Sequence, residues 1–224
     1  CWKNGFQPRG NSQYGRSSDA TSEVGARSDG LAVTGANQGT QSRTLTGSGP
    51  TSWRHDNTPF GIADLTGNVW EWSPGMRLVD GEIQVIENNN AALSTADFGA
   101  SSAEWMAIDG ATGTLVAPGT AGTVKYASAN SGTAGYTLYR VSGSSFEGMV
   151  NSTGANPVSA AAIARLKALG LFPVAPSGLG GDGFYLNVSG ERLPSRGGSW
   201  TLAALTGVFA LYLDNARTYS LAGL

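Results

Sequence analysis

The sequence predicts a single domain of the α+β class in which turns and short strands predominate over helices. Glycine accounts for 33 of the 224 residues, about twice its usual share. Charged residues make up only 13% of the chain, about half of the usual fraction. Glycine and asparagine supply the positive φ of tight turns, and convincing helical patterns are few. A chain of this length can bury one generous core or two small ones.

The chain divides into three regions that differ in composition and pattern. Residues 1 to about 75 are polar and rich in turn signals. Residues 76–190 contain short strand-like runs, such as 82–86 and 136–141, between tracts rich in Ala, Gly, Ser and Thr. The third region begins at about Glu191 and ends in a strand pattern. We find no internal repeat.

The middle region contains the one convincing helix. Asn156 can cap its N-terminus, and Pro157 suits its first turn. Gly170 then ends the pattern, because glycine favours the position just after a helix. Apolar residues recur between these limits at helical spacing, namely Ile163, Leu166 and Leu169.

The C-terminal strand has two different faces, because successive side chains of a strand point to opposite sides. One face is apolar and is expected to lie in the core: Phe209, Leu211 and Leu213. The other face mixes small, aromatic and acidic side chains: Ala210, Tyr212 and Asp214. Such a mixture is either a solvated face or a recognition face.

The inventory of reactive side chains excludes several chemistries. Any Ser-His-Asp or Cys-His system would have to use His55, the single histidine, and we expect a hydrogen-bonded loop histidine instead. Zinc sites built from Cys and His are excluded, since Cys1 is the single cysteine. Residues 178–183 match the dinucleotide fingerprint, but a strand pattern follows where a helix is required. We interpret this segment as a glycine-rich turn.

Charge and hydropathy limit the partners. A net charge of −2 gives no basic footprint for nucleic acid. No apolar run approaches the length of a membrane span. No loop has the ligand spacing of a calcium site, and we predict neither a metal nor a cofactor. The chain begins at Cys1 without a Met, and we expect it to be a fragment of a longer chain.

Residues 67–72, Gly-Asn-Val-Trp-Glu-Trp, hold two tryptophans around a carboxylate. These rings could stack on a sugar, or they could form a packed corner in which Asn68 and Glu71 satisfy buried backbone groups. We favour the packed corner and expect three tryptophans largely in the core: Trp70, Trp72 and Trp200. We also expect Arg196 to be a buried or half-buried hydrogen-bonding anchor beside the glycine pair that follows it.

Residues 67–72 together with Arg196-Gly-Gly-Ser-Trp200 resemble the motif pair of the formylglycine-generating-enzyme branch of the C-type lectin fold. The C-terminal stretch more closely resembles the variable proteins of diversity-generating retroelements, especially those of phages and prophages. The matching residues are 196–200, 207–209, Leu211, Leu213 and 215–217, with 8–11, 14–16 and 43–50 near the start. The resemblance implies a C-type lectin-like fold, in which 76–190 is an insertion between the two motif halves and 196–224 is the variable region.

The catalytic members of this branch depend on residues that are missing here. Formylglycine-generating enzymes use a pair of active-site cysteines, and the related sulfoxide synthases hold iron with histidines. This chain has no cysteine after Cys1 and a single histidine. The resemblance therefore implies a scaffold with a binding role, and we predict that the protein is not an enzyme.

In the variable proteins, miscopied template adenines change Asn codons into many others. When both adenines of an Asn codon change and its third base stays a pyrimidine, Lys, Gln, Glu, Met and Trp cannot be reached. None of these five residue types occurs in 201–224, although all occur earlier. By this resemblance the ligand-binding variable positions are Thr201, Leu202, Ala204, Leu205, Tyr212, Asp214, Thr218, Tyr219 and Leu221.

The resemblance implies a diversified ligand-binding protein that recognises a protein or other ligand on a bacterial cell surface. Its location would be a virion, in the phage tail or surface, or a bacterial cell surface. The apolar and tyrosine-rich character of 201–221 favours recognition over a solvated rim. The alternatives are a carbohydrate-binding lectin of the calcium or tryptophan type, a structural virion protein and, less favoured, a formylglycine-generating-type oxidase.

Overall fold

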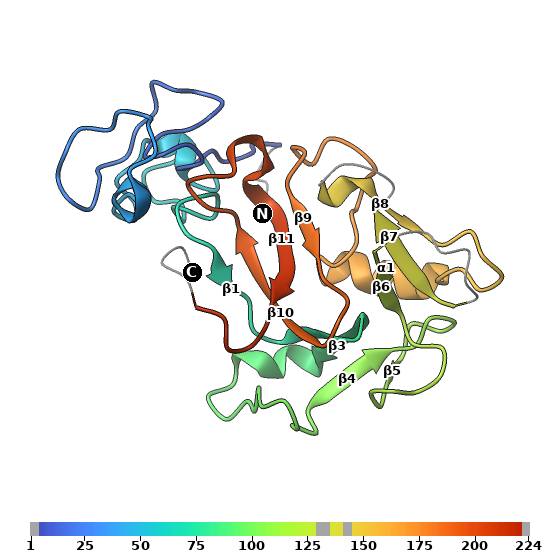
Figure 1. Ribbon diagram of the computed structural model, residues 1–224. Helices are drawn as coiled ribbons and strands as arrows, with labels where there is room; N and C mark the ends of the chain where they lie inside the picture. Colours follow the sequence, from blue (N-terminus) through green and yellow to red (C-terminus); the bar gives the residue numbers. More distant parts are fainter. Residues whose placement is uncertain (1–4, 129–134, 141–144, 221–224) are drawn as a thin grey trace.

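The computed structural model describes residues 5–128, 135–140 and 145–220. In these residues the protein is a mixed α/β structure that is mostly sheet and has few helices (Figure 1). This architecture confirms the sheet-rich character that the composition predicts and is compatible with the α+β class. None of the described helices is long and apolar enough to cross a membrane.

The described residues form eleven strands, one α-helix and five 3₁₀ turns. The strands are β1 (Glu71–Trp72), β2 (Met76–Val79), β3 (Glu82–Ile86), β4 (Trp105–Ile108), β5 (Leu115–Val116), β6 (Lys125–Ala127), β7 (Thr137–Arg140), β8 (Met149–Asn151), β9 (Phe184–Leu186), β10 (Glu191–Gly197) and β11 (Gly207–Asn215). The helical segments are α1 (Ala160–Ala168), η1 (Gly39–Ser42), η2 (Thr51–Trp53), η3 (Glu87–Ala92), η4 (Phe146–Gly148) and η5 (Ala203–Leu205).

The strands are linked in the order β8-β7-β6-β3-β2-β10-β11-β9, with β1 added to β10 and β4 and β5 added beside β3. Strand β10 joins the two halves of this sheet. Its first residues, Glu191 and Arg192, pair with β2, whereas Ser195 and Arg196 pair with both β1 and β11. The middle region of the chain is therefore hydrogen-bonded directly to the C-terminal strands.

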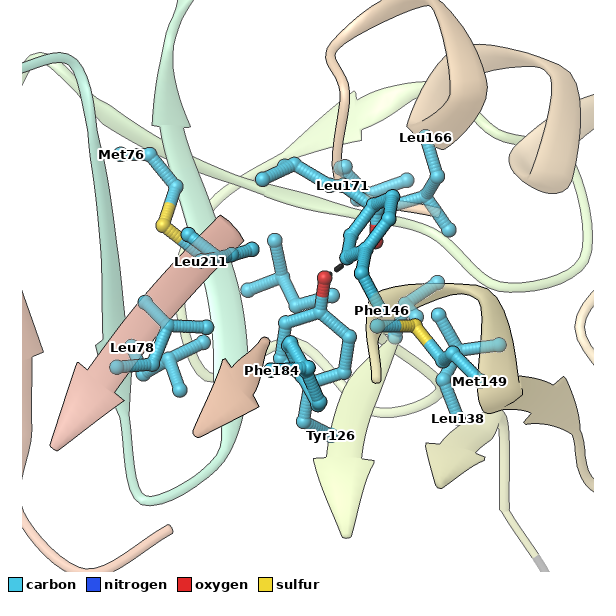
Figure 2. Packing of buried hydrophobic residues seen from close by; sticks show 14 of the residues in the cluster. Met76, Leu78, Tyr126, Leu138, Phe146, Met149, Leu166, Leu171, Phe184 and Leu211 are labelled. Carbon is cyan, nitrogen blue, oxygen red and sulfur yellow. Dashed lines mark hydrogen bonds between the residues drawn. The ribbon is translucent and has the colours of Figure 1, made fainter. Parts of the chain in front are cut away.

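The core lies between this sheet and α1 and combines side chains from the middle and C-terminal regions. Figure 2 shows the ring of Phe184 close to those of Tyr126 and Phe146. Its centroid lies 5.5 Å from that of Tyr126 and 6.1 Å from that of Phe146, and both contacts are edge-on. The buried Tyr126 hydroxyl donates a hydrogen bond to the carbonyl of Leu171. That bond ties β6 to the segment that follows α1.

Helix α1 starts later than the sequence predicts. Ser159 is the N-cap, and its Oγ accepts a hydrogen bond from the Ala162 N–H at 3.2 Å, so the prediction that Asn156 caps the helix is wrong. A serine nearer the first turn does this instead. The predicted end is confirmed, because Gly170 has a φ of +66°. The Leu171 N–H then bonds the Leu166 carbonyl at 2.8 Å, which closes the helix with a Schellman motif.

The N-terminal region is held together by turns and buried polar side chains. Between residues 5 and 70 the structure contains two 3₁₀ turns and isolated β-bridges. The buried amide of Asn68 accepts from the Thr44 N–H at 2.8 Å and donates to the Thr44 carbonyl at 2.9 Å. Asn11 donates to the same amide oxygen at 3.2 Å. The predicted role of Asn68 in satisfying backbone groups is confirmed.

Strand β11 has the predicted core face with one correction. Leu211 and Leu213 are completely buried, and Phe209 is half-buried and stacks on Phe146 at 6.4 Å. Ala210, placed on the mixed face by strict alternation, is completely buried as well. Between Arg196 and Gly197 the register of β10 with β11 shifts from Leu211 to Gly207, so the residues of β11 before Leu211 do not follow the alternating burial seen from Leu211 to Asn215.

The expected tryptophan core is only partly confirmed. Trp200 is buried, with 8% of its surface exposed, but Trp70 is half-buried and Trp72 is 39% exposed. Glu71 is also exposed, so its predicted role in satisfying buried groups is wrong. The strand that carries both residues, β1, is two residues long and pairs only with β10 among the described strands, so it lies at an edge of the sheet.

Candidate ligand-binding surface

The predicted variable positions lie at or near the molecular surface. Leu221 falls outside the described residues, and the other eight positions are exposed or half-buried. The exposed ones are Thr201, Ala204, Asp214, Thr218 and Tyr219, and the half-buried ones are Leu202, Leu205 and Tyr212. They occupy the η5 loop, the second half of β11 and the segment after β11.

The η5 loop is fixed by the N-terminal region. The Ala203 N–H donates to the Ser12 carbonyl at 3.0 Å, and the Tyr14 N–H donates to the Trp200 carbonyl at 2.9 Å. Buried Trp200 sits at the base of the loop. Ala204 lines a polar hollow of about 300 Å³ between this loop and the N-terminal segment. The loop positions are therefore displayed on a fixed backbone.

Tyr212 lies at the centre of an aromatic row on the sheet. Its ring centroid is 5.1 Å from that of Trp70 and 5.0 Å from that of Tyr185, and both pairs are tilted. Tyr185 is its register partner on the parallel strand β9. Since all three rings are half-buried, each presents part of its surface to solvent.

Leu205 extends this row to the η5 loop. The Gly183 N–H donates to the Leu205 carbonyl at 2.8 Å. A Cβ on Gly183 would lie 3.0 Å from the Tyr185 ring and 3.3 Å from the Leu205 Cβ, so Tyr185 and Leu205 flank the same point. We call Trp70, Tyr212, Tyr185 and Leu205 the apolar band. It connects the loop positions with the strand positions in one surface.

The hydroxyl of Tyr212 is a protonated donor at neutral pH. Burial raises its pKa to about 12, and the neighbouring Asp214 carboxylate acts in the same direction. The hydroxyl donates to Asp214 Oδ2 at 3.3 Å. The neighbouring Tyr219 and Tyr185 act in the same direction.

The segment after β11 is anchored by Arg217. Its guanidinium donates to both Glu191 carboxylate oxygens, at 2.7 Å and 2.8 Å, and to the Phe98 carbonyl at 2.6 Å. Two residues later, Tyr219 is 40% exposed, and its N–H bonds the Ala216 carbonyl at 2.9 Å. Thr218 and Tyr219 are thus held beside the sheet.

The variable-position prediction does not include two members of the band, Trp70 and Tyr185. For Tyr185 a signal is present in the sequence, because it alternates with apolar Phe184 and Leu186 as Tyr212 alternates with Leu211 and Leu213. The parallel pairing of β9 with β11, which places the two tyrosines together, has no local signal.

The described residues contain no group of three or more His, Cys, Asp or Glu side chains that could hold a metal ion. The predicted loop role of His55 is confirmed: its Nδ1 accepts from the Ile62 N–H at 2.8 Å. The predicted glycine-rich turn is confirmed too, since β9 follows it. Asp182 is a buried carboxyl whose pKa burial raises to about 7, and it accepts from the Phe209 N–H at 2.7 Å.

Neither a comparison with protein-family models nor a comparison with curated proteins finds a match to this chain. The fold and the surface described above are therefore the basis for a functional proposal.

Proposed function

We propose that this protein is a diversified ligand-binding protein of the retroelement variable type, with a C-type lectin-like fold of the formylglycine-generating-enzyme subtype. In this proposal residues 76–190 are an insertion into that fold, and 196–224 are the variable region. Side chains of the variable region select the ligand by non-covalent contact. Because a fold does not fix a function, the support comes from the surface itself.

The main support for this proposal is that the predicted variable positions and the residues between them differ in burial. None of the eight described variable positions is buried. The intervening framework residues include six that are buried: Thr206, Gly207, Ala210, Leu211, Leu213 and Asn215. A scheme that varies contacts while sparing the core requires this separation, because core substitutions commonly cost several kcal/mol.

The chemistry of the surface suits recognition. Tyrosine and tryptophan provide large contact areas at low entropic cost, and Tyr212 adds a hydroxyl donor. The half-buried rings of the apolar band are held by sheet neighbours, so little ordering is needed when a ligand binds. We propose that the ligand is a protein or other molecule on a bacterial cell surface. We further propose that the carrier is a virion or a bacterial surface, and that the protein is not an enzyme.

The first test is binding of fluorescently labelled protein to whole cells from a panel of bacterial species, measured by flow cytometry. We expect saturable binding to at least one strain and at least a tenfold loss in the double variant Tyr212→Ala, Tyr219→Ala. Leu93→Ala is the matched control, because Leu93 is 56% exposed and lies outside the surface. Equal binding by the double variant and the control would overturn the proposal.

The second test is genomic. We expect a near-copy of the coding stretch for residues 196–224 beside a reverse transcriptase gene. The two copies should differ only where the template has adenine. Differences scattered equally over all four bases would contradict the proposed diversification.

Carbohydrate binding is the second candidate, and the exposure of Trp72 favours it. A tryptophan 39% exposed at the sheet edge, near half-buried Trp70, offers rings on which a sugar can stack. Glycan-array binding that is lost in Trp72→Ala and retained in Tyr212→Ala would favour this candidate over the first.

A further inference from the structure

A cavity of about 350 Å³ lies on the other side of β10 from the apolar band, between β2, β3, η3 and the C-terminal end of α1. Apolar side chains of Met76, Val85 and Leu171 line it, and two guanidinium groups, those of Arg165 and Arg196, line it as well. Its volume is in the range of small-molecule sites.

Arg196 is a half-buried cation without a carboxylate partner among the described residues. Its Nη2 donates to the Gly170 carbonyl at 2.9 Å, where the end of α1 supplies only a partial negative charge. Burial lowers the pKa of this guanidinium, as expected for a charge removed from water without an acidic partner. Such a charge is costly unless an anion pairs with it.

Arg165 contributes a second cation from the last turn of α1. It is exposed, and its guanidinium makes no hydrogen bond or ion pair in the described part of the chain. Among the described residues, the one carboxylate that lines the cavity is that of the exposed Glu87. The side-chain amides of Asn88 and Asn89 add neutral donors. Two guanidinium groups against one carboxylate leave a single positive charge.

This cavity is distinct from the proposed recognition surface. Ser195 pairs with Tyr212, and Arg196 pairs with the buried Leu211. Since neighbouring residues of a strand point to opposite faces, Arg196 points away from the apolar band and toward α1. Loss of one site therefore does not imply loss of the other.

We propose that this cavity binds a small organic monocarboxylate, with its carboxylate on Arg196 and Arg165 and its apolar part against Met76 and Leu171. The planar guanidinium fork matches a carboxylate, and a monoanion balances the single positive charge. The apolar wall accommodates a hydrocarbon part and disfavours a fully hydrated inorganic ion.

The test uses octanoate as the probe, with isothermal titration of the whole chain. We expect saturable binding with one site, and at least tenfold weaker binding of the neutral isostere octanamide, which lacks the charge-assisted bonds. Octyl phosphate separates a carboxylate site from a general anion site, and we expect it to bind more weakly than octanoate. Octanamide or octyl phosphate binding as tightly as octanoate would overturn the proposal.

Two variants of α1 localise the binding. Arg165→Ala should weaken octanoate binding about tenfold, and since Arg165 is exposed, the fold should be retained. Lys167→Ala is the matched control, because it removes one positive charge from the same helix and does not line the cavity. Arg196→Met should abolish binding, with circular dichroism confirming the fold. Equal weakening by Arg165→Ala and Lys167→Ala, or undiminished binding in folded Arg196→Met, would contradict the site.

Discussion

Tyr212 and Tyr185 are register partners on the parallel strands β11 and β9, and their ring centroids lie 5.0 Å apart. The pair brings together two parts of the chain that are 27 residues apart in sequence, as 212 minus 185 gives. Tyr185 is not one of the predicted variable positions. The ring of this framework residue therefore packs against the ring of a variable residue, Tyr212.

The Tyr212–Tyr185 contact predicts a change in tyrosine ionisation. Burial is the largest cause of the raised pKa of Tyr212, and the Asp214 charge is the next. Tyr185→Ala, which uncovers one side of the ring, and Asp214→Asn, which removes the charge, should each lower the pKa of Tyr212. Ultraviolet absorbance of tyrosinate during a pH titration measures both shifts, with Tyr212→Phe identifying the transition. An unchanged pKa of Tyr212 in Tyr185→Ala would show that the ring contact does not contribute to the shift.

Asp182 predicts a pH-dependent loss of stability. Burial raises its pKa in the folded chain to about 7 from the ordinary value of 3.8. Between these two pH values the folded state therefore binds more protons than the unfolded state. Stability from this group is present below pH 4 and falls as the pH rises toward 7, by at most about 1.4 kcal/mol per pH unit.

Asp182→Asn tests this dependence, because a neutral amide oxygen can still accept from the Phe209 N–H. Urea unfolding at several pH values between 4.5 and 7.5 should give a stability difference, variant minus parent, that grows with pH. Other carboxylates titrate in both proteins and cancel in the difference. A difference independent of pH would contradict the raised pKa.

Glu191 connects Arg77 and Arg217, at 2.9 Å and 2.7 Å. Arg77 is 6% exposed, so Glu191→Gln leaves a buried cation without its carboxylate and should destabilise the fold by about 3 kcal/mol. Arg217→Ala removes the more exposed partner and should cost about 1 kcal/mol. Urea denaturation measures both. The reverse order of the two losses would argue against the buried Arg77 pair as the larger contributor.

Asn68 predicts a large loss of stability in the N-terminal region. Asn68→Ala removes both hydrogen bonds to Thr44 and should cost roughly 2–4 kcal/mol, since buried backbone groups lose their partners. Asn68→Gly is the matched control, because the native φ of 64° suits glycine, while the side-chain bonds are equally lost. If Asn68→Gly is nearly as stable as the parent, the positive φ alone accounts for the presence of asparagine at this position.

Local patterns in the sequence predicted the features that neighbouring residues control. The strand at residues 82–86, the end of α1 at Gly170 and the buried Leu211 and Leu213 follow from alternation, helical spacing and turn chemistry within a few residues. The loop role of His55 follows from the polar stretch around it. These properties depend on backbone dihedral angles and side-chain directions, which a short segment specifies by itself.

Only the tertiary structure decided which side chains are covered and which distant residues meet. Trp72 is exposed because β1 ends the sheet there, and Ala210 is buried where the β10–β11 register shifts. Tyr185 pairs with Tyr212 across two strands, and Arg165 and Arg196 line the same cavity. Both arrangements bring together segments that are far apart in the chain. Burial and contact depend on what packs against a residue from elsewhere, and no local periodicity contains that information.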